Sequence, residues 1–202
     1  MKRTDAIQKL NELKGQVLQD LAPQFGVTVK NIQKGTTNKG WAGHVCEGYL
    51  GLPINSSQQP DFGDWELKTI PIKTLKNGRK SFKETMAVTM INPQEVMNTP
   101  FEESHLLSKI KKLVVVARTV GKTVDDPSHF MSATSFDLPA DLYDEIKADY
   151  ESVQDTIKNK GFLSLTGRMG KYIQPRTKGS KGSTTRAFYA RPAFLEKFID
   201  LN

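Results

Sequence analysis

Cysteine is almost absent from this chain of 202 residues, in which Cys46 is the single example. One cysteine cannot form an internal disulfide or supply a cysteine-based zinc site, so any bound metal must be held by oxygen or nitrogen atoms. Such ligands favour a hard cation. We interpret Cys46 itself as a small packed hydrophobe.

Long apolar runs are also lacking, since no stretch approaches the roughly 18 to 20 residues of a membrane-spanning helix. The N-terminus, residues 1–5, reaches an acid at once and continues into an amphipathic pattern, which predicts a cytosolic protein without a secretion signal. With 37% hydrophobic and 25% charged residues, the composition is typical of one globular domain. No internal repeat is present.

The net charge is +7, and residues 161–202, with eight Lys or Arg against two Asp or Glu, contribute +6 of it. The eight cations are Arg168, Lys171, Arg176, Lys178, Lys181, Arg186, Arg191 and Lys197. Tyr172, Phe188 and Tyr189 are interleaved with them. Cations beside aromatic rings suit contacts with phosphates and bases, so this segment indicates a nucleic-acid partner. The alternative is a solvated basic surface.

Hydrophobic periodicity and turn residues predict mixed helices and strands, hence an α/β or α+β fold. Helices are expected at 5–21, 41–50, 103–111, 139–159 and 192–198, and strands at 65–72, 85–91, 113–117, 170–175 and 185–190. Asn77-Gly78 predicts a hairpin between the first two strands. Residues 113–117 are typical of a buried central strand, and residues 55–60 of a polar surface loop.

The segment from Asp61 to Lys68 carries the clearest chemical pattern. Alternate residues of a strand share a face, so Glu66 and Lys68 are expected to project together while Leu67 enters the core. Asp61 precedes the strand closely enough to fold back to the same place. Two carboxylates can bind a Mg²⁺-type ion, and an adjacent ammonium can orient water and offset charge on a phosphate. The alternative is an exposed strand with an ordinary Glu/Lys pair.

Glu47, on the helix expected at 41–50, is a candidate third carboxylate for the same site because it lies 14 residues before Asp61. His44 is one turn away on that helix. It is a candidate ligand, with a surface or capping role as the alternative.

Several segments together resemble the MutH family of nucleases, which have a PD-(D/E)xK core and include a mismatch-repair nicking endonuclease and Sau-type enzymes that cut GATC. The matching segments are 39–43 with Glu47, 60–62, 65–71, 103–105, 109–112, 171–179 and 186–189, and the run Glu-Leu-Lys-Thr-Ile-Pro at 66–71 is the most specific. The resemblance implies an α/β, restriction-endonuclease-like mixed β-sheet flanked by helices. It further implies a single MutH-like domain over 1–202, whose catalytic lobe (1–115) and recognition lobe (116–202) form a DNA-binding cleft.

Residue by residue, the resemblance makes Glu47, Asp61 and Glu66 the metal-binding acids and Lys68 the catalytic lysine, with Mg²⁺ as cofactor and Mn²⁺ as an expected substitute. Lys39 and Lys109 match basic positions near DNA or the active site. The recognition residues implied for double-stranded DNA are Arg176, Lys178, Arg186 and Tyr189, of which Tyr189 matches the tyrosine beside the methylatable adenine.

Sequence and resemblance together predict a Mg²⁺-dependent type II restriction endonuclease at GATC or a related short site. One catalytic centre per chain predicts a monomer that nicks one strand per encounter, and double-strand cutting would need a second binding event or a transient dimer. The gap of five residues from Asp61 to Glu66 is shorter than in MutH and favours restriction. The alternatives are a methyl-directed mismatch-repair nickase with repair partners, and a non-catalytic DNA-binding module. An RNA-binding role has no RRM or KH motif to support it.

Overall fold

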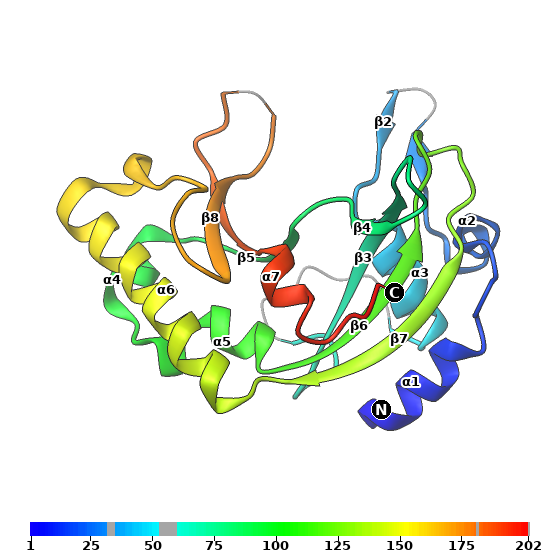
Figure 1. The fold of residues 1–202 in the computed structure, drawn as a ribbon, viewed down its shortest axis with the longest axis horizontal. Coiled ribbons are helices and arrows are strands. Elements are labelled where there is room, and N and C mark those ends of the chain that lie inside the picture. The colour runs from blue at the N-terminus through cyan, green and yellow to red at the C-terminus, as the bar shows by residue number, and fades with distance from the viewer. Residues whose placement is uncertain (32–34, 53–59, 181, 202) are drawn as a thin grey trace.

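The computed structural model describes residues 1–31, 35–52, 60–180 and 182–201 (Figure 1). The helices are α1 (Arg3–Asn11), α2 (Leu18–Leu21), α3 (Trp41–Tyr49), α4 (Pro93–Asn98), α5 (His105–Ile110), α6 (Ala140–Lys160) and α7 (Pro192–Leu195). The strands are β1 (Lys30–Asn31), β2 (Thr36–Thr37), β3 (Glu66–Thr74), β4 (Lys80–Phe82), β5 (Met86–Met90), β6 (Lys112–Thr119), β7 (Phe130–Asp137), β8 (Ile173–Thr177) and β9 (Arg186–Ala190). Most of the loop expected at 55–60, and Lys181, lie outside the described residues.

The main sheet has four strands in the order β4-β3-β6-β7. β3 and β6 run parallel, with Glu66 opposite Leu113, whereas the two outer strands are antiparallel to their neighbours. The predicted mixed β-sheet flanked by helices is therefore confirmed. The parallel pair matters most for function, because it places the N-terminal ends of β3 and β6 side by side.

Each face of the main sheet is buried in a different core. On one face Val114 and Val116 pack with Leu67 and residues of α1, α2 and α3. On the other face Leu113 and Val115 pack among residues of α5, α6 and α7. Because successive side chains of a strand point to opposite faces, a strand buried on both sides must be apolar at every position. The apolar run at 113–117, predicted as a central strand, meets this requirement.

A second sheet, β5-β9-β8, is antiparallel and packs beside α5 and α6. In Figure 1 the loop between β8 and β9 rises on one side of the molecule, and β2 with the loop between β6 and β7 rises on the other. The β8–β9 arm is the described part of residues 173–190, and the β1–β2 arm is residues 30–31 and 35–40 together with the loop at 120–129. The chain passes from one side to the other between β4 and β5 and again through β6.

Two local expectations are wrong. The helix expected at 5–21 is interrupted after Asn11, because Gly15 adopts φ +83° and donates its backbone N–H to the carbonyl of Phe130 at 2.9 Å. The hairpin turn at Asn77-Gly78 is present, but its second strand is β4 and not the run at 85–91. That run forms β5, which pairs with β9 in the second sheet.

Residue 115 is the expected boundary between the catalytic and recognition lobes. It lies in the middle of β6, where it is paired with Lys68 on one side and Thr134 on the other. The strand β7 was not predicted. Among the described residues, no helix is long and apolar enough to cross a membrane.

Candidate active site

The N-terminal end of β3 brings Glu66 and Lys68 together. Leu67 between them is buried in the core with α3, so the two charged side chains lie on the opposite face, as strand alternation predicts. Lys68 Nζ donates to Glu66 Oε1. Glu66 is only 1% exposed, so its carboxylate is held inside the protein at the end of the strand.

A turn before β3 folds Asp61 back onto the same place. The backbone N–H of Asp61 donates to Glu66 Oε2 at 3.2 Å, and the backbone N–H of Leu67 donates to Asp61 Oδ2 at 3.1 Å. The turn is packed by Phe62 and Trp65, whose rings stack with centroids 3.9 Å apart. Burial, and then the charge of Glu66, raise the pKa of Asp61 above its ordinary value.

Glu47 approaches this pair from α3. Burial raises its pKa to about 7, and the charges of Asp61 and Glu66 add to the rise while Lys68 and Lys109 oppose it. Three carboxylates from α3, a turn and β3 therefore share one electrostatic environment. A carboxyl group titrating near neutrality in such a place is a recognised mark of a functional site.

Lys109, expected near DNA or the active site, lies beside these carboxylates. Its ammonium, on α5, donates to Glu66 Oε2 at 2.8 Å, and the side chain is only 7% exposed. Ser104 begins α5 as an N-cap, accepting from the backbone N–H of Leu107 at 3.1 Å, and so sets the position of Lys109 on the helix. That cap is visible in the sequence, but the packing of α5 against the end of β3 is not.

His44 and Cys46, also on α3, do not join the carboxylates. His44 Nδ1 lies 3.5 Å from Asn38 Nδ2, at the start of the helix, so its contact is local. Cys46 is fully buried, and burial raises the pKa of its thiol to about 12, which makes it a packed and unreactive side chain.

The donor chemistry of the site fits a divalent cation. When ionised, the acids Glu47, Asp61 and Glu66 carry three negative charges against the two positive charges of Lys68 and Lys109, and carboxylate oxygens are the ligands that Mg²⁺ prefers. In the described part of the chain, no three His, Cys, Asp or Glu side chains are already arranged to hold a metal ion. Both Glu66 oxygens bear ammonium groups instead, so ion binding would require Glu66 to exchange a lysine partner.

The shared environment of Glu47 predicts a pH-dependent stability. Glu47 releases its proton near pH 4.5 in the unfolded chain and near pH 7 in the folded protein. Proton binding by Glu47 therefore favours the folded state. This contribution to stability is full below pH 4.5 and is lost as pH rises through about 7. Because Glu47 is only partly buried and solvent screens its charge, Glu47→Gln should make the metal-free protein more stable than wild type at pH 8 by about 1 to 2 kcal/mol, but not at pH 4.5.

Urea unfolding with EDTA at both pH values measures this difference. Glu196→Gln, at an exposed position near the C-terminus, is the matched control and should change stability equally little at both. A Glu47→Gln effect independent of pH would contradict the expectation.

Apart from Lys109, the residues implied for DNA contact lie on the two arms. The Arg176 guanidinium lies 5.7 Å from the ring centre of Tyr189, and Arg176 Nη1 donates to Thr85 Oγ1 at 3.0 Å. Lys178 is exposed near the tip of the β8–β9 arm. Arg186 Nη1 instead donates to the carbonyls of Thr184 and Thr185 in its own arm, at 3.1 and 3.3 Å.

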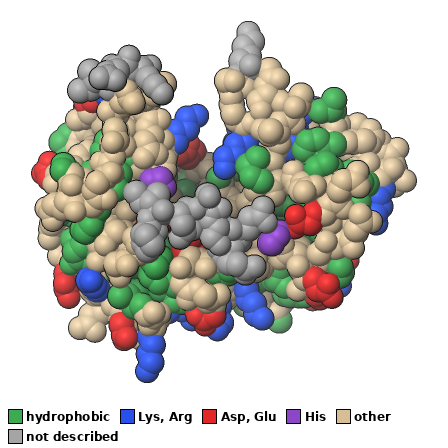
Figure 2. All heavy atoms as spheres, turned by 180° about the vertical axis from the view of Figure 1, so that it is seen from behind, with side chains coloured by type: hydrophobic (Ala, Val, Ile, Leu, Met, Phe, Trp, Pro, Cys, Tyr) green, Lys and Arg blue, Asp and Glu red, His purple; other side chains and the backbone are tan. Residues whose placement is uncertain are grey.

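Lys39 is exposed on the β1–β2 arm, just before α3. Figure 2 shows that the molecular surface is hollowed between its two projecting ends, with Lys or Arg side chains on both walls. The two arms therefore present positive charge toward each other.

Two acids and a lysine at the end of a central strand of a mixed sheet are the arrangement typical of nucleases of the PD-(D/E)xK class. Residues 50–148 match the family model described as DNA mismatch repair enzyme MutH, and this range contains Asp61, Glu66, Lys68 and Lys109. The chain belongs to the MutH/Sau3AI-type family of DNA endonucleases.

Individual relatives agree with this assignment. The chain is 31% identical over 155 residues to the type II restriction enzyme Sau3AI of Staphylococcus aureus, covering 74% of this chain but only 32% of that enzyme. It is 25% identical over 214 residues to the DNA mismatch repair protein MutH of Vibrio parahaemolyticus, covering 96% of this chain and 92% of the relative. It is 29% identical over 185 residues to MutH of Escherichia coli, covering 89% and 78%.

Among solved structures, a complex of the restriction endonuclease MvaI with its cognate DNA substrate aligns over 98% of both chains, at 15% identity and a TM-score of 0.38.

Proposed function

We propose that this protein is a Mg²⁺-dependent, sequence-specific endonuclease of double-stranded DNA that acts as a type II restriction enzyme. The observation that carries the proposal is the meeting of Asp61 and Glu66 with Lys68 at the end of β3, where Glu47 shares their electrostatic environment. An ordinary exposed Glu/Lys pair does not bring three acids into one environment, whereas a metal-dependent phosphodiesterase uses clustered carboxylates as metal ligands.

Each residue of the site has a role in this proposal. Asp61 and Glu66, with Glu47, hold Mg²⁺ or Mn²⁺, which when bound supplies positive charge to the scissile phosphate and acidifies a water molecule. Lys68 orients the attacking water and offsets charge that develops on the phosphate. Lys109 keeps Glu66 in place through its hydrogen bond to Glu66 Oε2. Hydrolysis yields a 5′ phosphate on the product.

Recognition is assigned to the β8–β9 arm. Arg176 and Lys178 are proposed to donate to guanine in the major groove, a contact worth about 1 to 3 kcal/mol of discrimination. Tyr189 is proposed to lie beside the adenine of a GATC or related site. Lys39 and Arg186 are proposed to contact backbone phosphates, which contribute affinity but not sequence preference.

Restriction is favoured over repair by the short spacing from Asp61 to Glu66 and by the identity of 31% with Sau3AI, against 25% and 29% with the two MutH proteins. The MutH relatives are the observation in favour of the second candidate, a methyl-directed nickase that depends on repair partners. In both cases we propose a monomer that cuts one strand per encounter, with a transient dimer on DNA for double-strand cuts, in the bacterial cytoplasm.

Incubation of supercoiled plasmid with the purified protein and Mg²⁺, Mn²⁺ or Ca²⁺ tests the proposal. We expect cleavage with Mg²⁺ or Mn²⁺ and without partner proteins, and sequencing of cut ends from methylated and unmethylated genomic DNA should give one short site. Cleavage only with added mismatch-repair proteins would support the repair candidate. Binding of duplex DNA without cleavage under any metal would support the non-catalytic module and overturn the nuclease proposal.

A further inference from the structure

A pocket of about 260 Å³ lies on the β1–β2 arm, between the start of α3 and the loop that follows β6. Four of its lining residues are cations, Lys39, Lys83, Arg118 and Lys122. We call this set the basic pocket. None of the carboxylates of the active site lines it.

Arg118 forms the buried part of the basic pocket. Its guanidinium lies 5.2 Å from the ring centre of Trp41 at the start of α3, and its Nη1 donates to Ser128 Oγ at 3.0 Å. Its Nε is buried and has no hydrogen-bond partner within the described part of the chain. Burial also lowers the pKa of Arg118. Among the described residues no carboxylate forms an ion pair with Arg118, and a partly buried cation of this kind is stabilised when an anion approaches.

Two acids, Glu84 and Asp126, also line the basic pocket and must be weighed against its cations. The Asp126 carboxylate is engaged in its own turn, where it accepts from the backbone N–H of Thr123 at 2.7 Å and lies near Lys122. Glu84 is exposed, and its charge acts on both Arg118 and Tyr189. Four cations against two acids leave an excess of two positive charges. Thr85, which follows Glu84, accepts from Arg176 Nη1 of β8 at 3.0 Å, so this wall of the basic pocket adjoins the second sheet.

The helix α3 relates the basic pocket to the active site. Trp41, which lines the pocket, and Glu47, which belongs to the active site, are six residues apart on α3. With a rise of 1.5 Å per residue, this separation is about 9 Å along the helix axis. An anion in the basic pocket is therefore distinct from a scissile phosphate beside Glu66, yet near enough to belong to the same nucleic acid strand.

We propose that the basic pocket binds one backbone phosphate of duplex DNA that neighbours the scissile phosphate, and so holds the strand in register with the active site. This inference rests on the proposed function. Such a contact contributes affinity and position without reading a base, because phosphate contacts carry no sequence information.

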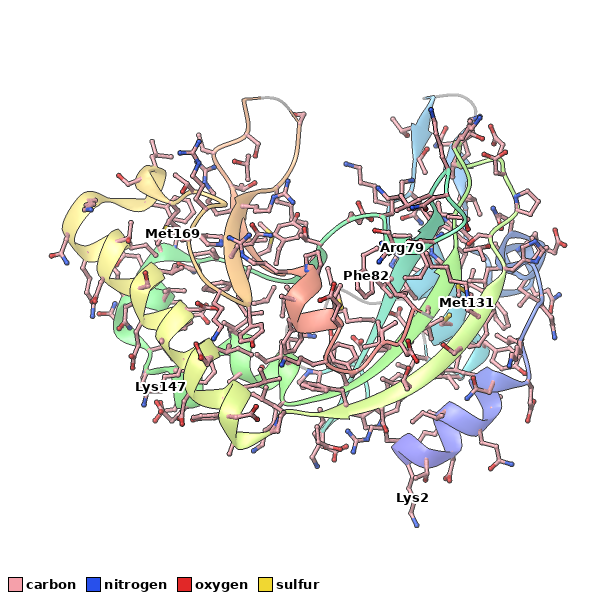
Figure 3. The ribbon with its side chains drawn as sticks, viewed as in Figure 1. Lys2, Arg79, Phe82, Met131, Lys147 and Met169 are labelled. Atoms are coloured by element: carbon pink, nitrogen blue, oxygen red, sulfur yellow. The ribbon has the colours of Figure 1, made fainter. Side chains whose placement is uncertain are left out.

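The test measures how the affinity of the full chain for a duplex containing the cleavage site depends on salt, in EDTA so that no cutting occurs. Each phosphate neutralised contributes about 0.9 to the slope of log affinity against log salt. Lys122→Ala and Arg118→Met should each lower the slope by up to about 1. Lys2→Ala is the control, since Lys2 is exposed and points away from the arms (Figure 3), and it should leave the slope unchanged.

A duplex series with a single methylphosphonate at successive positions identifies the phosphate. One methylphosphonate near the cleavage site should weaken DNA binding by wild type several-fold. The same methylphosphonate should weaken binding by Lys122→Ala little further. The basic pocket would be overturned as a phosphate site by two results together. These are a salt slope equal to that of wild type in both variants, and no methylphosphonate position that weakens wild type more than Lys122→Ala. Failure of wild type to bind duplex DNA at all would overturn the proposed function and this inference with it, whereas altered sequence preference in Lys122→Ala would overturn the assignment to the backbone.

Discussion

Replacing Lys68 with alanine should slow DNA cleavage by on the order of 10²- to 10⁴-fold, while the protein stays folded and binds duplex DNA. Lys68 is partly exposed and contacts Glu66 Oε1, whereas Lys109 holds the other oxygen. Removing Lys68 therefore leaves Glu66 paired. What is lost is the positive charge beside the attacking water and the phosphate.

Single-turnover cleavage measures the rate, and fluorescence anisotropy in EDTA measures binding. Lys112→Ala is a matched control, because Lys112 lies at the start of β6, next to the start of β3, but makes an exposed ion pair with Asp64 at 3.0 Å. It should retain nearly full activity. A Lys68→Ala protein that cleaves at the wild-type rate, or that loses binding to the same extent as cleavage, would show that Lys68 has another role.

Replacing Asp149 with alanine should lower the free energy of unfolding by roughly 3 kcal/mol. The Asp149 carboxylate, on α6, is 6% exposed and accepts the backbone N–H groups of Lys171, Tyr172 and Ile173 at 2.6, 2.8 and 2.8 Å. Tyr172 and Ile173 are buried, so their N–H groups would lose their partner without gaining water. Each such loss costs about 1 to 3 kcal/mol.

Urea unfolding of Asp149→Ala and of Asp144→Ala measures this effect. Asp144 is on the exposed side of the same helix, so its replacement should change stability by less than about 0.5 kcal/mol. Because Asp149 fixes the start of β8, Asp149→Ala should also weaken DNA binding through Arg176 without touching the carboxylates. Equal stability of the two variants would contradict this account.

The parts of the fold that the sequence predicted are those with a strong local pattern. The continuous apolar run of β6 and the alternation at the start of β3 both depend on side chains within one strand. Local pattern does not predict which strand pairs with which, because pairing depends on contacts between residues distant in sequence. β5 was therefore assigned to the wrong hairpin, and β7, with Ser132, Thr134 and Ser135 among its residues, was missed.

The same limit applies to the site. The closeness of Glu66 and Lys68 follows from a spacing of two residues in a strand. The contact between Lys109 and Glu66 joins residues 43 positions apart, and Asp149 reaches backbone groups 22 to 24 positions away. Nothing in the spacing of either residue indicates its partner. Residue chemistry suggested which groups could act together, whereas tertiary packing determines which of them meet.

The sharing of β6 between two cores restricts how this protein can change. Neighbouring residues such as Val114 and Val115 are both fully buried but belong to opposite sides. A larger or polar residue at either position disturbs one side directly and, by shifting the backbone, the other as well. Residues 113–117 should therefore tolerate little beyond exchange among aliphatic residues, whereas the exposed residues of the arms are free of this double constraint.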